Sequence, residues 1–127
     1  MADLPITSLF AGGFALALVG LSLMVTLRRV KTTILLGEGD DIGLRRRIRA
    51  QANFIEYVPL GIIVLTLMEL RGLPAVGVLS LGTALAVGRL LHAVGMYRDA
   101  PVLRGLGILA TYAVLAGGGV AVILSAV

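Results

Sequence analysis

The chain has 127 residues, of which 58% are hydrophobic and 14% are charged, and its mean hydropathy is +1.03. Soluble domains are about 45–50% apolar, so this composition indicates an integral membrane protein, with one domain over residues 1–127 and no separate soluble module. The absence of cysteine excludes disulfides and a cysteine nucleophile, and a single histidine argues against a metal centre. The formal charge of +4 comes from clustered arginines, which indicate membrane topology rather than nucleic-acid binding.

Four apolar segments predict an all-α, four-span membrane bundle. The spans are expected at about residues 4–28, 45–71, 74–97 and 102–126. Each is long enough to cross about 30 Å of hydrocarbon. The acidic start and long apolar run of the first span favour a retained helix over a cleaved signal peptide.

Glycine, aspartate and proline mark the breaks between these spans. A polar loop surrounds residues 37–43, a tight turn is expected at 72–74, and proline follows an Arg-Asp pair at 98–101. Pro59 lies inside the second span, where it removes a backbone hydrogen bond and should bend the helix.

The basic residues predict the orientation in the membrane. Seven lie in or beside the first loop, two lie beside the third, and only Arg71 lies at the opposite side. The positive-inside rule therefore places both basic loops in the cytoplasm and both termini outside. Arg71 and the nearby Glu69 are expected to anchor the far interface.

Polar residues on the second span indicate a binding site. At 100° per residue, Asn53 lies about 40° to one side of Arg49 and Glu56 about 20° to the other. One helix face thus presents a guanidinium, an amide and a carboxylate, which suits a small zwitterionic ligand. Charge within a bilayer is costly and indicates function. Gln51 points about 160° away from Asn53, so it would reach the same ligand only between subunits or around the helix.

The third span carries Arg89 and His92 at a depth near that of Glu56. Glu56 and Arg89 are therefore candidates for a buried ion pair. The structural alternative, in which Arg89 simply holds helices together, is favoured for Arg89 but not for the polar face of the second span. His92 fits either role. Arg28 and Arg29, at the end of the first span, could mark topology or clamp a carboxylate.

These residues resemble the MAPEG family, the membrane-associated proteins in eicosanoid and glutathione metabolism. The resemblance covers nearly the whole chain and is greatest to small bacterial members. It rests on Arg49-Ala50-Gln51, Asn53, Glu56-Tyr57 and Pro59, and on Gly88-Arg89 and His92. It implies a homotrimer in the cell inner membrane, with glutathione bound as cosubstrate between neighbouring subunits near the cytoplasmic side.

The resemblance also implies roles for individual residues. Arg49 and Asn53 would hold carboxylate or amide groups of glutathione, Glu56 would take its ammonium, and Gln51 and Tyr57 would add polar contacts. The further candidates for glutathione binding are Arg28 or Arg29 from the first helix, with Arg89, His92 and Tyr97 from the third.

Arg104 falls near the arginine that stabilises the glutathione thiolate in the eukaryotic synthases. It is the candidate catalytic residue, because a guanidinium lowers the pKa of a thiol. Those synthases carry a tyrosine where this chain has Met96, which cannot donate a hydrogen bond. Tyr97 is adjacent and could replace that contact from another angle.

The predicted activity is that of a microsomal-type glutathione transferase or peroxidase acting on hydrophobic small molecules or lipids. One alternative is a non-catalytic scaffold that binds lipids or ligands. The other alternative is a small proton-coupled exporter, which is ranked last. Glu56 lies on the same face as Arg49 and at a depth near that of Arg89, and these two positive charges would hold Glu56 ionised.

Overall fold

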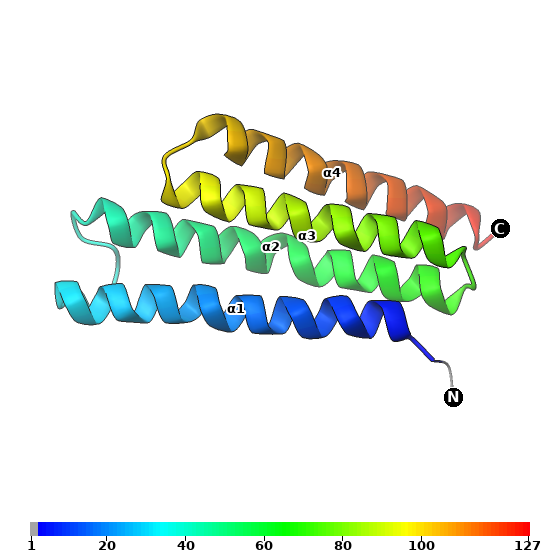
Figure 1. The fold of residues 1–127 in the computed structure, drawn as a ribbon, viewed down its shortest axis with the longest axis horizontal. Coiled ribbons are helices and arrows are strands. Elements are labelled where there is room, and N and C mark those ends of the chain that lie inside the picture. The colour runs from blue at the N-terminus through cyan, green and yellow to red at the C-terminus, as the bar shows by residue number, and fades with distance from the viewer. Residues whose placement is uncertain (1–2) are drawn as a thin grey trace.

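The computed structural model describes residues 3–127, and this part of the chain forms four α-helices. They are α1 Pro5–Thr32, α2 Ile42–Leu70, α3 Ala75–Tyr97 and α4 Pro101–Leu124 (Figure 1). All four are long and apolar enough to cross a membrane, which confirms the all-α, four-span prediction. The observed helices differ most from the expected spans at the first loop, where α1 continues to Thr32 and α2 begins at Ile42.

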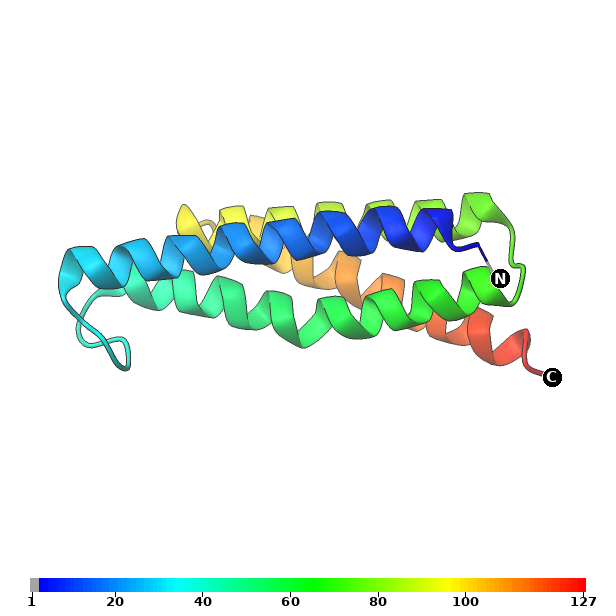
Figure 2. The same cartoon turned by 90° about the horizontal axis from the view of Figure 1, so that it is seen from below.

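Local chemistry explains where the helices begin. Pro5 and Pro101 occupy the first positions of α1 and α4, where a missing N–H costs nothing. The carboxylate of Asp41 caps α2 by accepting from the backbone N–H of Leu44. The helix α2 continues through Pro59 and bends near its middle (Figure 2).

The helices run antiparallel, so the two charged connections lie at one end and both termini lie at the other (Figure 1). Helix α2 packs between α1 and α3, and α4 packs on α3 and α2. Helix α4 is inclined to the other three (Figure 2). Within the described residues, α1 makes no contact with α4, so α1 depends on α2 and α3 alone.

Apolar side chains fill the centre of the bundle. Phe14 of α1 meets Phe54 of α2 edge to face, with ring centres 5.8 Å apart. Leu85 of α3 packs in the same cluster. A second apolar cluster, built around Leu65 and Val78, lies toward the termini. These two clusters join α1, α2 and α3 through the middle of the bundle and toward the termini.

The connection between α1 and α2 is held by arginines. Arg28 forms a two-pronged ion pair with Asp41, with the Nη2–Oδ2 distance at 2.8 Å. Arg29 donates to loop carbonyls, at 3.1 Å for Ile34 and 2.8 Å for Gly37. Both arginines are therefore engaged in shaping the loop.

The opposite end of the bundle is closed by Glu69 of α2. Its two carboxylate oxygens accept the backbone N–H groups of Ile6 and Thr7, at 3.0 and 2.8 Å. The first turn of a helix leaves N–H groups without helical partners, and an anion there is favoured by the helix dipole. Glu69 therefore caps α1 rather than acting only as an interfacial anchor. Arg71 beside it donates to the carbonyl of Ser125 at 3.0 Å.

Candidate functional site

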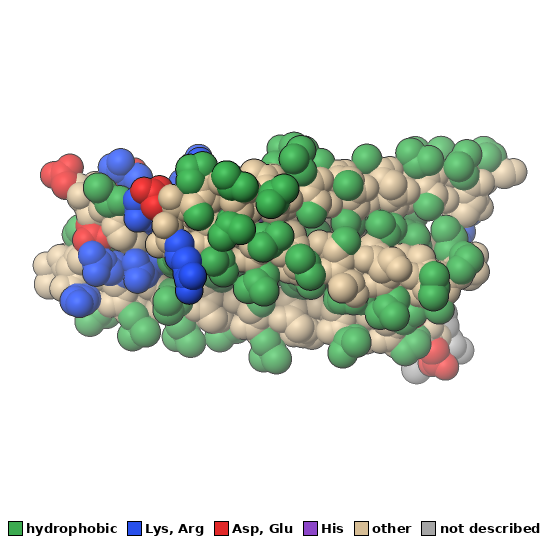
Figure 3. Space-filling view, turned by 45° about the horizontal axis from the view of Figure 1, so that its top comes forward, with side chains coloured by type: hydrophobic (Ala, Val, Ile, Leu, Met, Phe, Trp, Pro, Cys, Tyr) green, Lys and Arg blue, Asp and Glu red, His purple; other side chains and the backbone are tan. Residues whose placement is uncertain are grey.

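A polar cavity of about 320 Å³ lies at the charged end of the bundle, between α2, α3 and α4. Its lining consists of Arg49, Ala52, Asn53, Glu56, His92, Met96 and Arg104. The cavity thus brings together five of the candidate site residues predicted from the sequence, contributed by three different helices. The space-filling view shows Lys and Arg side chains gathered at this end (Figure 3).

The charged groups of the cavity are largely unengaged. Among residues 3–127, Arg49 and Glu56 form no ion pair or side-chain hydrogen bond, and both side chains are exposed. The guanidinium of Arg104 lies 3.8 Å from the sulfur of Met96, a weak acceptor. A cation and an anion held apart on one surface can each take a partner from a zwitterionic ligand.

Arg89 lies behind this cavity, with only 4% of its surface exposed. It donates to Asn53 Oδ1 and Thr111 Oγ1, each at 2.5 Å, and to the carbonyl of Gly107 at 3.1 Å. Its guanidinium carbon lies 5.4 Å from the centre of the Tyr57 ring, a cation–π distance.

The predicted ion pair between Glu56 and Arg89 is wrong. Glu56 faces the cavity, while Arg89 is directed toward Asn53 and α4.

The residue that makes this arrangement possible is Gly107. A Cβ there would lie 2.5 Å from the carbonyl oxygen of Gly88, so only glycine lets α3 and α4 approach this closely. Thr111 and Gly107 were missed in the sequence because their role exists only after α4 packs on α3.

Gln51 lies away from the polar cavity, as its helical position predicts. It donates to the hydroxyl of Ser22 on α1 at 2.8 Å. Arg28 and Arg29 are bound to the first loop, so none of these three lines the cavity of its own chain.

The two candidate tyrosines also lie outside the cavity. The hydroxyl of Tyr57 is 3.4 Å from that of Tyr112 on α4. The ring of Tyr97 lies 5.6 Å from the guanidinium carbon of Arg47. In this chain Met96 rather than Tyr97 faces the cavity.

Apolar surface adjoins the polar cavity. A depression of about 350 Å³ shares His92 and Arg104 with it and continues along α4 past Gly105 and Ile108. Arg104 therefore lies between a polar space and an apolar one, which is where a charged group would meet a membrane-dissolved reactant.

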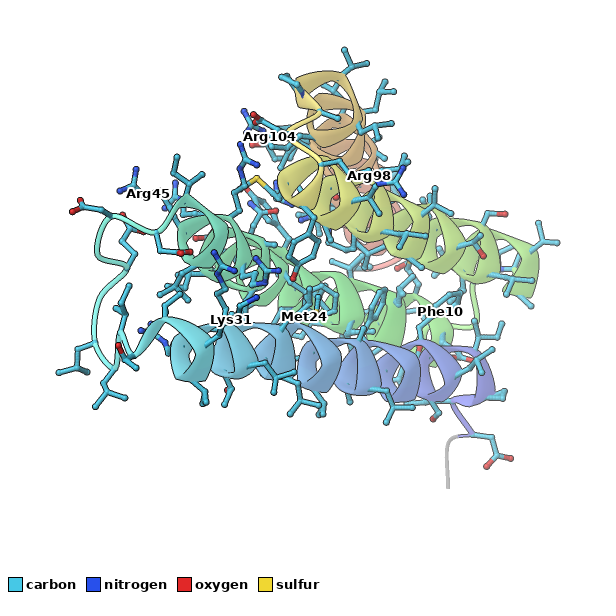
Figure 4. The ribbon with its side chains drawn as sticks, turned by 60° about the vertical axis from the view of Figure 1, so that its left-hand side comes forward. Phe10, Met24, Lys31, Arg45, Arg98 and Arg104 are labelled. Carbon is cyan, nitrogen blue, oxygen red and sulfur yellow. The ribbon has the colours of Figure 1, made fainter. Side chains whose placement is uncertain are left out.

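A second apolar space lies between α1 and α3. It measures about 500 Å³ and borders Phe10, Met24 and Leu90, with Tyr97 at one end. Figure 4 shows Phe10 and Met24 along the side of α1 that faces α3. This apolar space exists because α1 packs only loosely against α3.

The cavity and its backing carry a net positive charge. Three arginines, Arg49, Arg89 and Arg104, stand against one carboxylate, Glu56, which gives a formal charge of +2. Such a site favours a ligand with more negative than positive groups.

Comparison with known proteins identifies the family. The family model described as MAPEG family matches residues 7–124. The chain belongs to the MAPEG family. It is also similar to the Inner membrane protein YecN of Escherichia coli strain K12 and of strain O6:H1, at 31% identity over 110 residues in each case. That alignment covers 87% of this chain and 84% of each relative.

The residues of α2 on which the resemblance to the MAPEG family rested lie on different faces of the helix. The motif that they form therefore has two parts. Arg49, Asn53 and Glu56 line the polar cavity of their own chain, and Gln51 and Tyr57 contact α1 and α4 instead.

Proposed function

We propose that this protein binds glutathione in the polar cavity and activates its thiol, as a glutathione transferase or peroxidase of the inner membrane. The observation that carries the proposal is the set of unengaged charges in a cavity whose lining and backing together have a formal charge of +2. Glutathione has two carboxylates and one ammonium, and its thiolate form has a net charge of −2. The cavity and that form of the ligand therefore have opposite charge.

The proposed binding contacts follow from the lining of the cavity. Arg49 binds a carboxylate of glutathione, Glu56 binds the ammonium, and Asn53 donates to a carboxylate or amide oxygen. His92 adds a polar contact at the inner wall. Glutathione fits such a site because its ammonium and at least one of its carboxylates then have partners of opposite charge.

Arg104 supplies the chemistry in this proposal. Its guanidinium favours the thiolate over the thiol, and the released proton goes to solvent at the charged end of the bundle. The thiolate sulfur then attacks an electrophilic carbon of a hydrophobic molecule in the apolar depression. A sulfur–carbon bond forms as the bond to the leaving group breaks, and no covalent enzyme intermediate is required.

The proposed assembly is a homotrimer with both basic loops in the cytoplasm. Gln51, with Arg28 or Arg29, would then approach the ligand held by a neighbouring subunit. Two features support this arrangement. Gln51 lies on the opposite side of α2 from Asn53, and many large apolar side chains of the described residues remain exposed on the outside of the single bundle.

A non-catalytic ligand-binding protein is the second candidate. It is favoured by Met96, which lies beside Arg104 and cannot donate a hydrogen bond to a thiolate. One experiment separates the two functions. Glutathione binding to the purified protein is measured by calorimetry, the ultraviolet absorbance of the thiolate is recorded, and conjugation of a chloronitrobenzene is followed. Thiolate formation with conjugation supports the transferase; binding without either supports the scaffold; no binding rejects both glutathione proposals.

A further inference from the structure

Arg89 differs from the other charged residues in that it is the only buried Lys, Arg, Asp or Glu among residues 3–127. Its hydrogen bonds go to an amide, a hydroxyl and a carbonyl, and no carboxylate of the described residues pairs with it. A buried guanidinium in a membrane is costly and indicates a functional position. Among the described residues that line the cavity, Asn53 is the one to which Arg89 donates a hydrogen bond, so its effect on the cavity is expected to pass through Asn53.

The contact with Arg89 determines which way the Asn53 amide faces. A guanidinium has five N–H donors and no acceptor, so Asn53 must turn Oδ1 toward it. The Nδ2 group of Asn53, with two donors, then points elsewhere. Within the described residues Nδ2 has no acceptor, and it is not one of the buried polar atoms that lack a partner. Because Asn53 lines the cavity, these N–H donors are available there.

We propose that Arg89 is a positioning residue that locks Asn53 in a single orientation, so that the cavity offers N–H donors at this point and no acceptor. A freely rotating asparagine could present either its oxygen or its nitrogen. The locked asparagine selects ligands with a carboxylate or carbonyl oxygen at this position and disfavours ligands with an ammonium there. The inference deepens the proposed function and rests on it for the identity of the ligand.

A double-mutant cycle tests whether Arg89 acts through Asn53. Glutathione affinity is measured by calorimetry for Asn53→Ala, Arg89→Gln and the double variant. A hydrogen bond to a charged group is involved, so each single change should weaken binding about tenfold. The double variant should match the weaker single variant. Losses that multiply to about a hundredfold would overturn the proposal, as would wild-type affinity in Arg89→Gln.

Asn53→Asp is the sharper variant, because the variant itself keeps Arg89 in place. The new carboxylate pairs with Arg89, so the melting temperature should rise, and the same change in an Arg89→Gln background should give no rise. Glutathione binding should weaken at least tenfold, because the cavity now presents an oxygen to the ligand carboxylate. An unchanged melting temperature, or retained affinity, would overturn the proposed lock.

The two proposals fail in different ways. Wild-type protein that does not bind glutathione rejects the proposed function, and the melting temperatures still decide whether residue 53 faces Arg89. Wild-type binding with a multiplicative cycle rejects the role of Arg89 alone.

Discussion

Glu56 and Glu69 lie on the same helix, about 20 Å apart at 1.5 Å per residue, and they are used in opposite ways. Glu69 accepts two backbone N–H groups from α1. Glu56 has no partner among residues 3–127 and faces a cavity with Arg49 and Arg104. Near the termini, Glu69 holds the start of α1 in place. At the other end, ion pairs hold the connections, but the charged groups that line the polar cavity are left without charged partners. In a membrane protein, the carboxylate without a structural partner is the better candidate for ligand binding.

The largest expected effect is on catalysis at the charged end. Arg104→Ala should lower the rate of glutathione conjugation about 10²–10³-fold, because the thiolate loses its stabilising charge. Glutathione affinity should fall much less. Arg104→Lys retains a positive charge and should recover part of the rate. Steady-state kinetics with saturating glutathione measure this, and an unchanged rate in Arg104→Ala would remove Arg104 from the mechanism.

The next effect sharpens the structural side of the comparison. Glu69→Gln removes the charge and one of the two acceptors at the start of α1, which should lower the free energy of unfolding by about 1–3 kcal/mol. Denaturation in detergent, followed by circular dichroism, measures the change. Glutathione affinity should stay at the wild-type value. A variant as stable as the wild type would show that Glu69 does not hold α1 in place.

Glu56→Gln is the matched change at the other end. It should weaken glutathione binding about tenfold by removing the partner of the ammonium, because hydrogen bonds to charged groups contribute about 1.5–3 kcal/mol. The free energy of unfolding should not change, since Glu56 supports no other described residue. Calorimetry and denaturation are run on both glutamate variants. Equal affinity in Glu56→Gln would reject its role.

The smallest effect concerns pH and the first loop. The Arg28 guanidinium, followed by the N–H of Leu44, holds the pKa of the Asp41 carboxyl below its usual range. A lowered pKa in the folded state stabilises the fold above the ordinary value of about 4, and this contribution is lost as the pH falls through the lower value.

The protection factors for hydrogen exchange in the α1–α2 connection, which are corrected for the intrinsic pH dependence of exchange, should therefore fall only in acid, below about pH 4. In Asp41→Asn, these protection factors should be lower than in the wild type at neutral pH and should change little on acidification. Protection in the wild type that is already lost at neutral pH would contradict this assignment.

Much of the architecture could be predicted from the sequence. Apolar runs and Gly, Asp and Pro breaks located four helices, and a rotation of 100° per residue placed Arg49, Asn53 and Glu56 on one face. These are local properties of a chain, fixed by helix geometry.

The partners of Arg89 could not be predicted. The helical rise of 1.5 Å per residue placed Arg89 at a depth near that of Glu56. It did not predict how α3 is rotated about its axis relative to α2. The hydrogen bonds of Arg89 to Gly107 and Thr111 also exist only once α4 packs against α3. The cap on α1 was missed for a similar reason, because Glu69 and Ile6 are 63 residues apart in the chain.

The most direct test is a calorimetric titration of reduced glutathione into the wild-type protein in detergent, repeated at higher salt. The unpartnered charges predict saturable binding that weakens as salt screens the attraction between the positively charged cavity and an anionic tripeptide. No saturable binding at millimolar glutathione, or binding that is indifferent to salt, would contradict the view that these charges are kept free to hold the ligand.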